Sequence, residues 1–171
     1  LEPFDRGDVK ILGHDLGSMT EADKARMRAN DIAFVFQSYN LISNLTAYEN
    51  VLMASALSEK PSPGRVKEVL GEVGMASHMH KYPAELSGGM QQRVAIARAI
   101  VNRPSVLFAD EPVGNLDTVT GHQVMDVLKA LNRDHHMTIL MVTHNMETVR
   151  YGTRTLSIED AVVSRDERHD T

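Results

Sequence analysis

A short apolar segment that ends in two adjacent carboxylates constrains this chain more than any other feature. Residues 106–109 (Val-Leu-Phe-Ala) have the pattern of a buried strand, and Asp110 and Glu111 follow directly. At the end of such a strand, one carboxylate can lie near a metal ion while the next remains available to act on water. Taken alone, the pair could equally end a solvated strand, so its interpretation depends on the rest of the chain.

A glycine pair beside a serine supports a functional interpretation of these two carboxylates. Ser87, Gly88 and Gly89 precede the polar run 91–93 (Gln-Gln-Arg) at the start of a predicted helix. The start of a helix offers backbone N–H groups and its dipole to an anion, and the serine adds a hydroxyl. A Leu-Ser-Gly-Gly sequence by itself is more often an ordinary turn before a helix. Together with the strand that ends at Asp110, however, it favours an anion site.

The predicted elements alternate between strands and helices. Apolar runs at residues 32–37, 106–109 and 138–143 predict buried strands, and spaced apolar residues predict helices at about 90–102 and 119–133. Strands that alternate with helices favour a parallel sheet with helices packed on it. We therefore expect an α/β fold.

Residues 38–83 contain only helix signals and indicate an inserted helical subdomain. Thr46 and Glu49 form a capping box, and a second helix is predicted from Ser62 and Pro63 to a stop near Gly74. The remaining predicted elements are a strand at 8–12, a helix capped by Thr20 that runs to about 28, and two short strands within 155–163, before a polar end expected to fray from Ser164.

The composition limits the class of protein. The 171 residues carry a formal net charge of −5, which argues against non-specific nucleic-acid binding as the main role. Because the chain has no cysteine, it forms neither a disulfide nor a thiolate metal site. No apolar run approaches the roughly 20 residues that span a bilayer, and we expect no signal peptide.

Five short motifs in a fixed order resemble those of the ATP-binding cassette (ABC) ATPases. In chain order they are the strand that ends at Gln37, the signature at 86–92, the Walker B end Asp110-Glu111, the D-loop at 115–117 and His144 just after a strand. Any one of these is a weak signal, whereas the ordered set is a strong one. The resemblance implies a P-loop NTPase-like core with a mostly parallel sheet. It also implies three segments, which are a partial core at 1–37, a helical subdomain at 38–85 and the rest of the core at 86–171.

The resemblance also implies roles for these residues. Glu111 is expected to polarise the attacking water and His144 to contact the γ-phosphate of ATP. Gln37 is expected to bind Mg²⁺, orient water and sense a membrane partner, and Asp110 to hold Mg²⁺ directly or through water. The residues expected to bind nucleotide through the signature and the D-loop are Ser87, Gly88, Gly89, Gln91 and Asp117.

A finer resemblance concerns the ATPases that serve FtsX/MacB-type permeases, which release lipoproteins, export macrolides or act in cell division. It rests on residues 34–37, 45–51 and 110–117 and on Thr120-Gly121. Val113 and Met90 depart from the threonine and glutamine that are usual there, and Asp160-Ala161 replaces an Asp-Gly turn.

The family's arrangement implies two partners and no nucleic acid. Each ATP lies between the phosphate loop of one subunit and the signature of another, so a second ATPase subunit is expected, most simply in a homodimer. The other partner is an integral membrane permease, expected to contact the groove between Gln37 and the helices of residues 46–74. The chain is therefore expected to be a cytoplasmic subunit on the inner face of the membrane. There it would hydrolyse ATP to power export, lipoprotein release or envelope remodelling.

One family motif is missing from these residues. The sequence contains no Gly-x-x-x-x-Gly-Lys-[Ser/Thr] phosphate loop, and no glycine is followed by lysine. We therefore expect an N-terminally truncated cassette that alone neither binds ATP tightly nor hydrolyses it, and whose strands at 32–37 and 106–109 are partly uncovered. The alternative is a degenerate, non-catalytic subunit that binds a partner. A chromosome-maintenance ATPase is disfavoured, because the 50 positions from Gln37 to Ser87 are too few for a long coiled coil.

Overall fold

A three-stranded parallel sheet forms the centre of the computed structural model, which describes residues 6–57, 61 and 63–169. Its strands, in spatial order, are β3 (Ile32–Phe36), β4 (Val106–Asp110) and β5 (Thr138–Val142). At the carboxyl end of the sheet, Phe36, Asp110 and Val142 share one row of the register. The residues that follow the three strands therefore start side by side.

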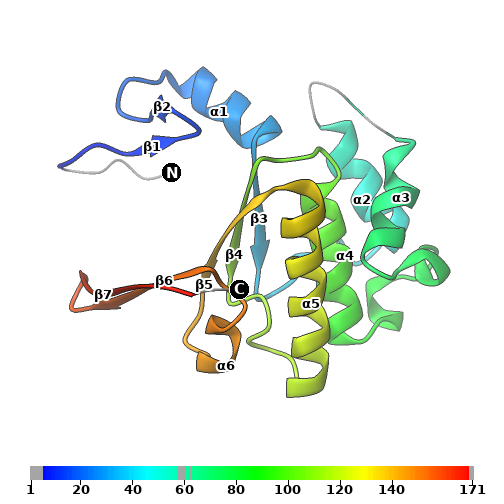
Figure 1. Cartoon of the computed structure of the whole chain (residues 1–171). Coiled ribbons are helices and arrows are strands. Elements are labelled where there is room, and N and C mark those ends of the chain that lie inside the picture. The colour runs from blue at the N-terminus through cyan, green and yellow to red at the C-terminus, as the bar shows by residue number, and fades with distance from the viewer. Residues whose placement is uncertain (1–5, 58–60, 62, 170–171) are drawn as a thin grey trace.

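Helices cover one face of this sheet. Figure 1 shows α4 (Gly88–Ile100) and α5 (Thr118–His135) on that face, with α2 (Ala47–Ala56) and α3 (Arg65–Glu72) beyond α4. Alternate strand residues point toward the helices, since Val35, Leu107 and Ala109 are buried. Val35 and Leu107 join the apolar faces of the four helices in one core. The expected α/β fold with parallel strands is confirmed.

The opposite face of the sheet is only partly covered. The helix α1 (Glu21–Asn30) and the small hairpin of β1 (Lys10–Ile11) and β2 (His14–Asp15) lie over its amino-terminal part, where Leu16, Met27 and Ile32 form a second, smaller core. Toward the carboxyl end Phe34 and Phe36 are 38% and 40% exposed. The expected exposure of residues 32–37 is thus confirmed at these two positions. In the strand at 106–109, also expected to be partly uncovered, Phe108 is half-buried while Leu107 and Ala109 are buried.

The helical segment between β3 and α4 begins as the capping signals indicate. The Thr46 hydroxyl accepts a hydrogen bond from the Glu49 backbone N–H, and a Glu49 carboxylate oxygen accepts one from the Thr46 N–H at 2.8 Å. The start predicted for α3 is wrong, because the helix begins at Arg65 after Gly64; Ser62 lies outside the described residues. The helix ends before Gly74, whose φ of +73° suits glycine. Two 3-10 turns, Ala76–His78 and Pro83–Glu85, lead into α4.

The polypeptide after β5 forms the short helix α6 (Met146–Val149) and the hairpin of β6 (Arg154–Glu159) and β7 (Val162–Arg168). The expectation that the chain frays from Ser164 is wrong, since β7 continues through Arg168. A bidentate Arg154–Asp166 ion pair joins the two strands beyond that point. The strand expected at 8–12 is also wrong in extent, because β1 and β2 have two residues each around a turn at Gly13. No helix in the described part of the chain is long and apolar enough to cross a membrane.

Candidate functional site

Four of the predicted site residues follow or end the strands at the carboxyl end of the sheet. They are Gln37, Asp110, Glu111 and His144. Glu111 follows β4 and His144 lies just after β5, and their side chains are in contact. A Glu111 oxygen accepts a hydrogen bond from the His144 backbone N–H at 2.7 Å, and the other lies 3.1 Å from the Thr143 hydroxyl. The Glu111 side chain is 16% exposed, whereas that of His144 is 84% exposed. The glutamate is therefore held by the chain while the histidine faces solvent.

The backbone at Glu111 is unusual. Its φ of 43° places a non-glycine residue in the left-handed region, while its N–H donates to the Val142 carbonyl at 2.9 Å. Such conformations persist where surrounding contacts determine them, and they concentrate at functional sites. The turn directs the chain away from the sheet immediately after β4, and Gly114 and Leu116 close the loop through backbone bonds to Glu111 and Val113.

Asp110 meets the chemical requirements of a cation ligand. It is exposed at the end of β4, and no hydrogen bond to its carboxylate is found among the described residues. The described residues contain no cluster of three or more histidine, cysteine or acidic residues that could hold a metal ion. A cation bound here would therefore need ligands from elsewhere. That pattern suits Mg²⁺, which commonly takes one or two carboxylates and fills its shell with water and phosphate oxygens.

Gln37, the first residue after β3, is bonded to the loop that follows Glu111. Its side-chain nitrogen donates to Asn115 Oδ1 at 2.9 Å, and Asn115 Nδ2 donates to the Gln37 backbone carbonyl at 3.2 Å. The segment after β3 and the loop after β4 are thus joined by two hydrogen bonds across 78 positions of sequence.

The signature glycines lie at the start of α4, where Ser87 is the N-cap and its hydroxyl accepts from the Met90 N–H. Glycine is required at both positions for packing. A Cβ on Gly89 would overlap the Thr120 methyl group, and one on Gly88 would lie 2.8 Å from the Tyr39 hydroxyl. The helix begins at Gly88, two residues before its predicted start, and the two glycines lie close to α5 and to the segment after β3. The Met90 N–H is taken by the Ser87 hydroxyl, whereas no acceptor for the N–H groups of Gly88 and Gly89 is found among the described residues, so these two remain available to an anion.

Two other predicted nucleotide-binding residues make local contacts. The Gln91 amide donates to the Leu86 carbonyl at 3.1 Å. Asp117 is the N-cap of α5 and accepts from the Thr120 N–H at 3.0 Å. Hydrogen bonds from the Thr120 side chain and backbone lower the pKa of the Asp117 carboxyl. These contacts determine the positions of the Gln91 and Asp117 side chains within the chain itself.

The turn after Gln37 is held by an arginine that the sequence analysis did not select. Tyr39 and Asn40 have φ values of 56° and 51°, and Arg98 of α4 donates to both of their carbonyl oxygens. Burial lowers the pKa of Arg98 and raises that of Tyr39. The signal for Arg98 was weak, because an arginine in a helix that also carries Arg93 does not reveal which distant carbonyls it binds.

Thr143 and Asn115 were also missed as site residues, although both belong to segments that the sequence singled out. Thr143 ends the predicted strand before His144, and Asn115 opens the D-loop motif. Their position next to predicted site residues was the available signal. Their partners, Glu111 and Gln37, lie 32 and 78 positions away and could not be identified from spacing.

Comparison with known proteins identifies the family. A family model described as ABC transporter matches residues 1–114. The lipoprotein-releasing system ATP-binding protein LolD 2 of Rhodopseudomonas palustris is 44% identical over 166 residues, which cover 95% of this chain and 72% of that protein. The macrolide export ATP-binding/permease protein MacB of Syntrophobacter fumaroxidans is 40% identical over 162 residues, which cover 92% of this chain and 23% of that protein.

Solved structures agree with this. The dimeric post-hydrolysis structure of the ATP-binding cassette MJ0796 bound to ADP and Pi matches with a TM-score of 0.82 at 35% identity, over 95% of this chain and 73% of that one. A second dimeric MJ0796 structure matches with a TM-score of 0.81 at 37% identity. The parallel sheet, the ordered motifs at its carboxyl end and these matches lead to one conclusion. The chain belongs to the ABC transporter family, as one of its ATP-binding cassettes.

Proposed function

We propose that this ABC ATPase powers an integral membrane permease for export, lipoprotein release or envelope remodelling, with Glu111 as its catalytic base. The observation that supports this most is the position of Glu111, a largely shielded carboxylate directly after Asp110 and hydrogen-bonded to the segment after β5. A carboxylate held in place by the chain is suited to orient and polarise an attacking water.

The other residues complete the proposed chemistry. Asp110 and the side-chain oxygen of Gln37 would hold Mg²⁺. When bound, this ion would neutralise part of the negative charge of the phosphates. His144, exposed and tied to Glu111, would donate to the γ-phosphate of ATP and keep the base oriented.

Nucleotide binding is proposed to involve a second subunit. Ser87, Gly88 and Gly89 form the start of α4. Gln91 lies in the first turn of that helix, and Asp117 is the N-cap of α5. The MJ0796 cassette, which this chain resembles, is a dimer in its solved structures. We therefore propose a homodimer in which these residues of one copy approach the nucleotide held by the other.

A permease is the second proposed partner. A groove of about 370 Å³ lies between β3, α2 and α4, and the exposed apolar side chains of Met53 and Leu57 lie along it together with Phe34. Asn102 also lines it, and its buried Oδ1 has no donor among the described residues. Exposed apolar residues around a groove favour a protein partner. We propose that an apolar segment of the permease binds here, which would place the ATPase on the inner face of the membrane.

This groove overlaps the contact surface expected from the sequence at α2 but does not reach Gln37. The three-part division into residues 1–37, 38–85 and 86–171 fits a helical subdomain whose α2 and α3 pack on α4. We propose that the permease contacts this helical segment through α2, at the groove that α2 shares with β3 and α4.

Phosphate release tests the catalytic proposal. The purified gene product is assayed with Mg²⁺ and ATP beside the Glu111→Gln variant, and ATP binding is measured separately. Hydrolysis that depends on Glu111 supports the proposal. Binding without hydrolysis by the wild-type protein would instead favour the non-catalytic subunit, and catalysis by this chain would be abandoned.

Co-purification tests the groove. Leu57→Asp places a charge in the proposed contact and is expected to reduce recovery of the permease at least tenfold. Val119→Asp, another exposed apolar residue but on α5, serves as the matched control. Equal recovery of the permease with both variants would reject the groove as the docking surface.

A further inference from the structure

Asn115 forms a two-point contact with Gln37 whose geometry dictates the orientation of both amides. The backbone carbonyl of Gln37 can only accept a hydrogen bond, so the group of Asn115 that faces it, at 3.2 Å, must be the NH₂. The Asn115 oxygen is then the atom directed at the Gln37 side chain. Because this oxygen only accepts, Gln37 must present its own NH₂, as observed at 2.9 Å.

The remaining polar atom of the Gln37 side chain is its oxygen. A primary amide carries its donor and acceptor on opposite sides of one carbon, so fixing the nitrogen on Asn115 leaves Oε1 as the atom that Gln37 offers to a ligand. No donor to this oxygen is found among the described residues. Carbonyl oxygens are the ligands that Mg²⁺ prefers, whereas an outward NH₂ would repel a cation.

Gly114 makes room for this arrangement. A Cβ at position 114 would lie 2.8 Å from the Gln37 side-chain nitrogen and 3.4 Å from the Glu111 Cβ. The Gln37 amide therefore packs directly against the backbone of the loop that begins at Glu111. A bulkier residue would move the amide away from Asn115, so glycine and asparagine act together at 114 and 115.

We propose that Asn115 is a positioning residue that keeps the oxygen of Gln37, rather than its NH₂, available to the catalytic cation. Asn115 acts through Gln37 and does not touch the reacting atoms. This inference rests on the proposed function, in which Gln37 and Asp110 bind Mg²⁺ during ATP hydrolysis. Without Asn115 the Gln37 amide rotates freely and presents its oxygen for only part of the time.

The test measures Mg²⁺ binding directly, by titrating the cation into the nucleotide-bound full gene product, together with the Mg²⁺ dependence of its ATP hydrolysis. Asn115→Ala is expected to raise the half-saturating Mg²⁺ concentration about two- to tenfold, the range that follows from losing one net hydrogen bond. Asn115→Asp retains an acceptor for the Gln37 NH₂ but loses the donor to the Gln37 carbonyl, so its half-saturating concentration is expected to lie between those of the wild type and the alanine variant. Asn132→Ala removes a comparable amide, bonded to the Met137 carbonyl at 2.7 Å, and is expected to change nothing.

A double-mutant cycle separates positioning from a structural role. In a Gln37→Ala background, Asn115→Ala is expected to cause no further shift in the Mg²⁺ dependence, because the amide oxygen that Asn115 positions is gone and only its bond to the backbone carbonyl at 37 remains. Equal shifts in both backgrounds, or no shift in the wild-type background, would overturn the inference while Glu111-dependent hydrolysis still supported the proposed function. If the wild-type protein shows no Glu111-dependent hydrolysis, the proposed function fails and this inference fails with it.

Discussion

Glu111 and His144 are joined twice, since one Glu111 oxygen accepts from the His144 backbone N–H at 2.7 Å and lies 2.5 Å from its ring Nδ1. The first contact depends only on the backbone, so it persists whatever side chain occupies position 144. The second orients the imidazole, whose other nitrogen is directed away from the glutamate. The loops after β4 and β5 are therefore coupled through the carboxylate proposed as the catalytic base.

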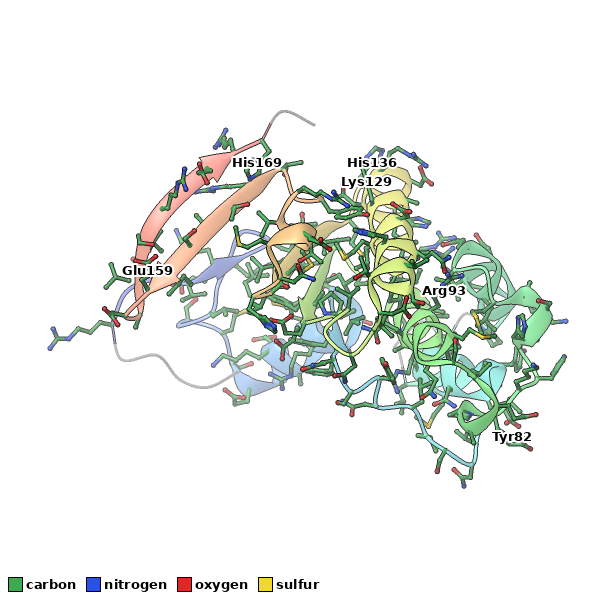
Figure 2. The ribbon with its side chains drawn as sticks, turned by 90° about the horizontal axis from the view of Figure 1, so that it is seen from below. Tyr82, Arg93, Lys129, His136, Glu159 and His169 are labelled. Carbon is green, nitrogen blue, oxygen red and sulfur yellow. The ribbon has the colours of Figure 1, made fainter. Side chains whose placement is uncertain are left out.

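Replacing this carboxylate by an amide is expected to separate binding from turnover. Glu111→Gln retains the size of the side chain but loses the basic oxygen, so ATP binding is expected to persist while kcat falls by about 10²–10⁴. Phosphate release and nucleotide binding are measured on the same preparation. Glu159→Gln, at the far end of the β6–β7 hairpin (Figure 2), is the matched control. Normal turnover in Glu111→Gln would remove Glu111 from its proposed role.

The close approach of α4 to α5 predicts a steric conflict at Gly89. In Gly89→Ala the new methyl group would overlap the Thr120 methyl, and overpacking of this kind costs about 1–3 kcal/mol of folding free energy. Thr120→Ser removes the opposing methyl and is expected to recover most of this loss in the double variant. Denaturant unfolding measures both effects.

Gly71 provides the control for this pair. It lies within α3, and a Cβ there would meet nothing within 4 Å. Gly71→Ala is therefore expected to stabilise the protein by about 0.5–1 kcal/mol through helix propensity alone. A Gly89→Ala variant as stable as Gly71→Ala would show that the two helices separate without cost.

Local signals predicted the elements well, whereas contacts between distant segments escaped the sequence. The capping box of Thr46 and Glu49 determined the start of α2 because its bonds are made within four residues. The proximity of Glu111 and His144 could also be predicted, because each follows a strand and parallel strands end at the same edge of the sheet. The Gln37–Asn115 pair depends on how two loops fold onto each other. No periodicity or spacing encodes that contact.

Two wrong predictions have different causes. The helix α4 was predicted from about residue 90, but its N-cap is Ser87, so Gly88 and Gly89 belong to it. Local polarity suggested fraying after Ser164, but pairing with β6 retains those residues in a strand. There a contact with another element outweighed the local preference of the sequence.

The N-cap of α5 predicts a pH effect on stability. The pKa of Asp117 is lowered from its ordinary 3.8 by hydrogen bonds from Thr120, so folding favours the ionised form. This stabilisation is complete above the ordinary pKa and is lost as the pH falls below it toward the folded pKa. Asp117→Asn also caps a helix but does not titrate. Thermal melts over acidic pH are therefore expected to show a shallower acid decline for this variant, and identical curves would contradict the assignment.

The turn between β6 and β7 predicts a stabilising substitution. Asp160 and Ala161 have φ values of 49° and 62°, the mirror-image turn that suits a two-residue hairpin but strains a side chain. Aspartate tolerates this region, whereas alanine carries a cost of about 1–2 kcal/mol. Ala161→Gly removes that cost. Glycine also gives the unfolded chain more conformational freedom, which lowers the stability by about 0.4–1 kcal/mol. We therefore expect the free energy of unfolding to rise by roughly 0.5–1 kcal/mol. Ala76→Gly, in a 3-10 turn without positive φ, gains nothing and is expected to lose stability. If urea unfolding showed a loss for both variants, the strain assigned to Ala161 would be absent.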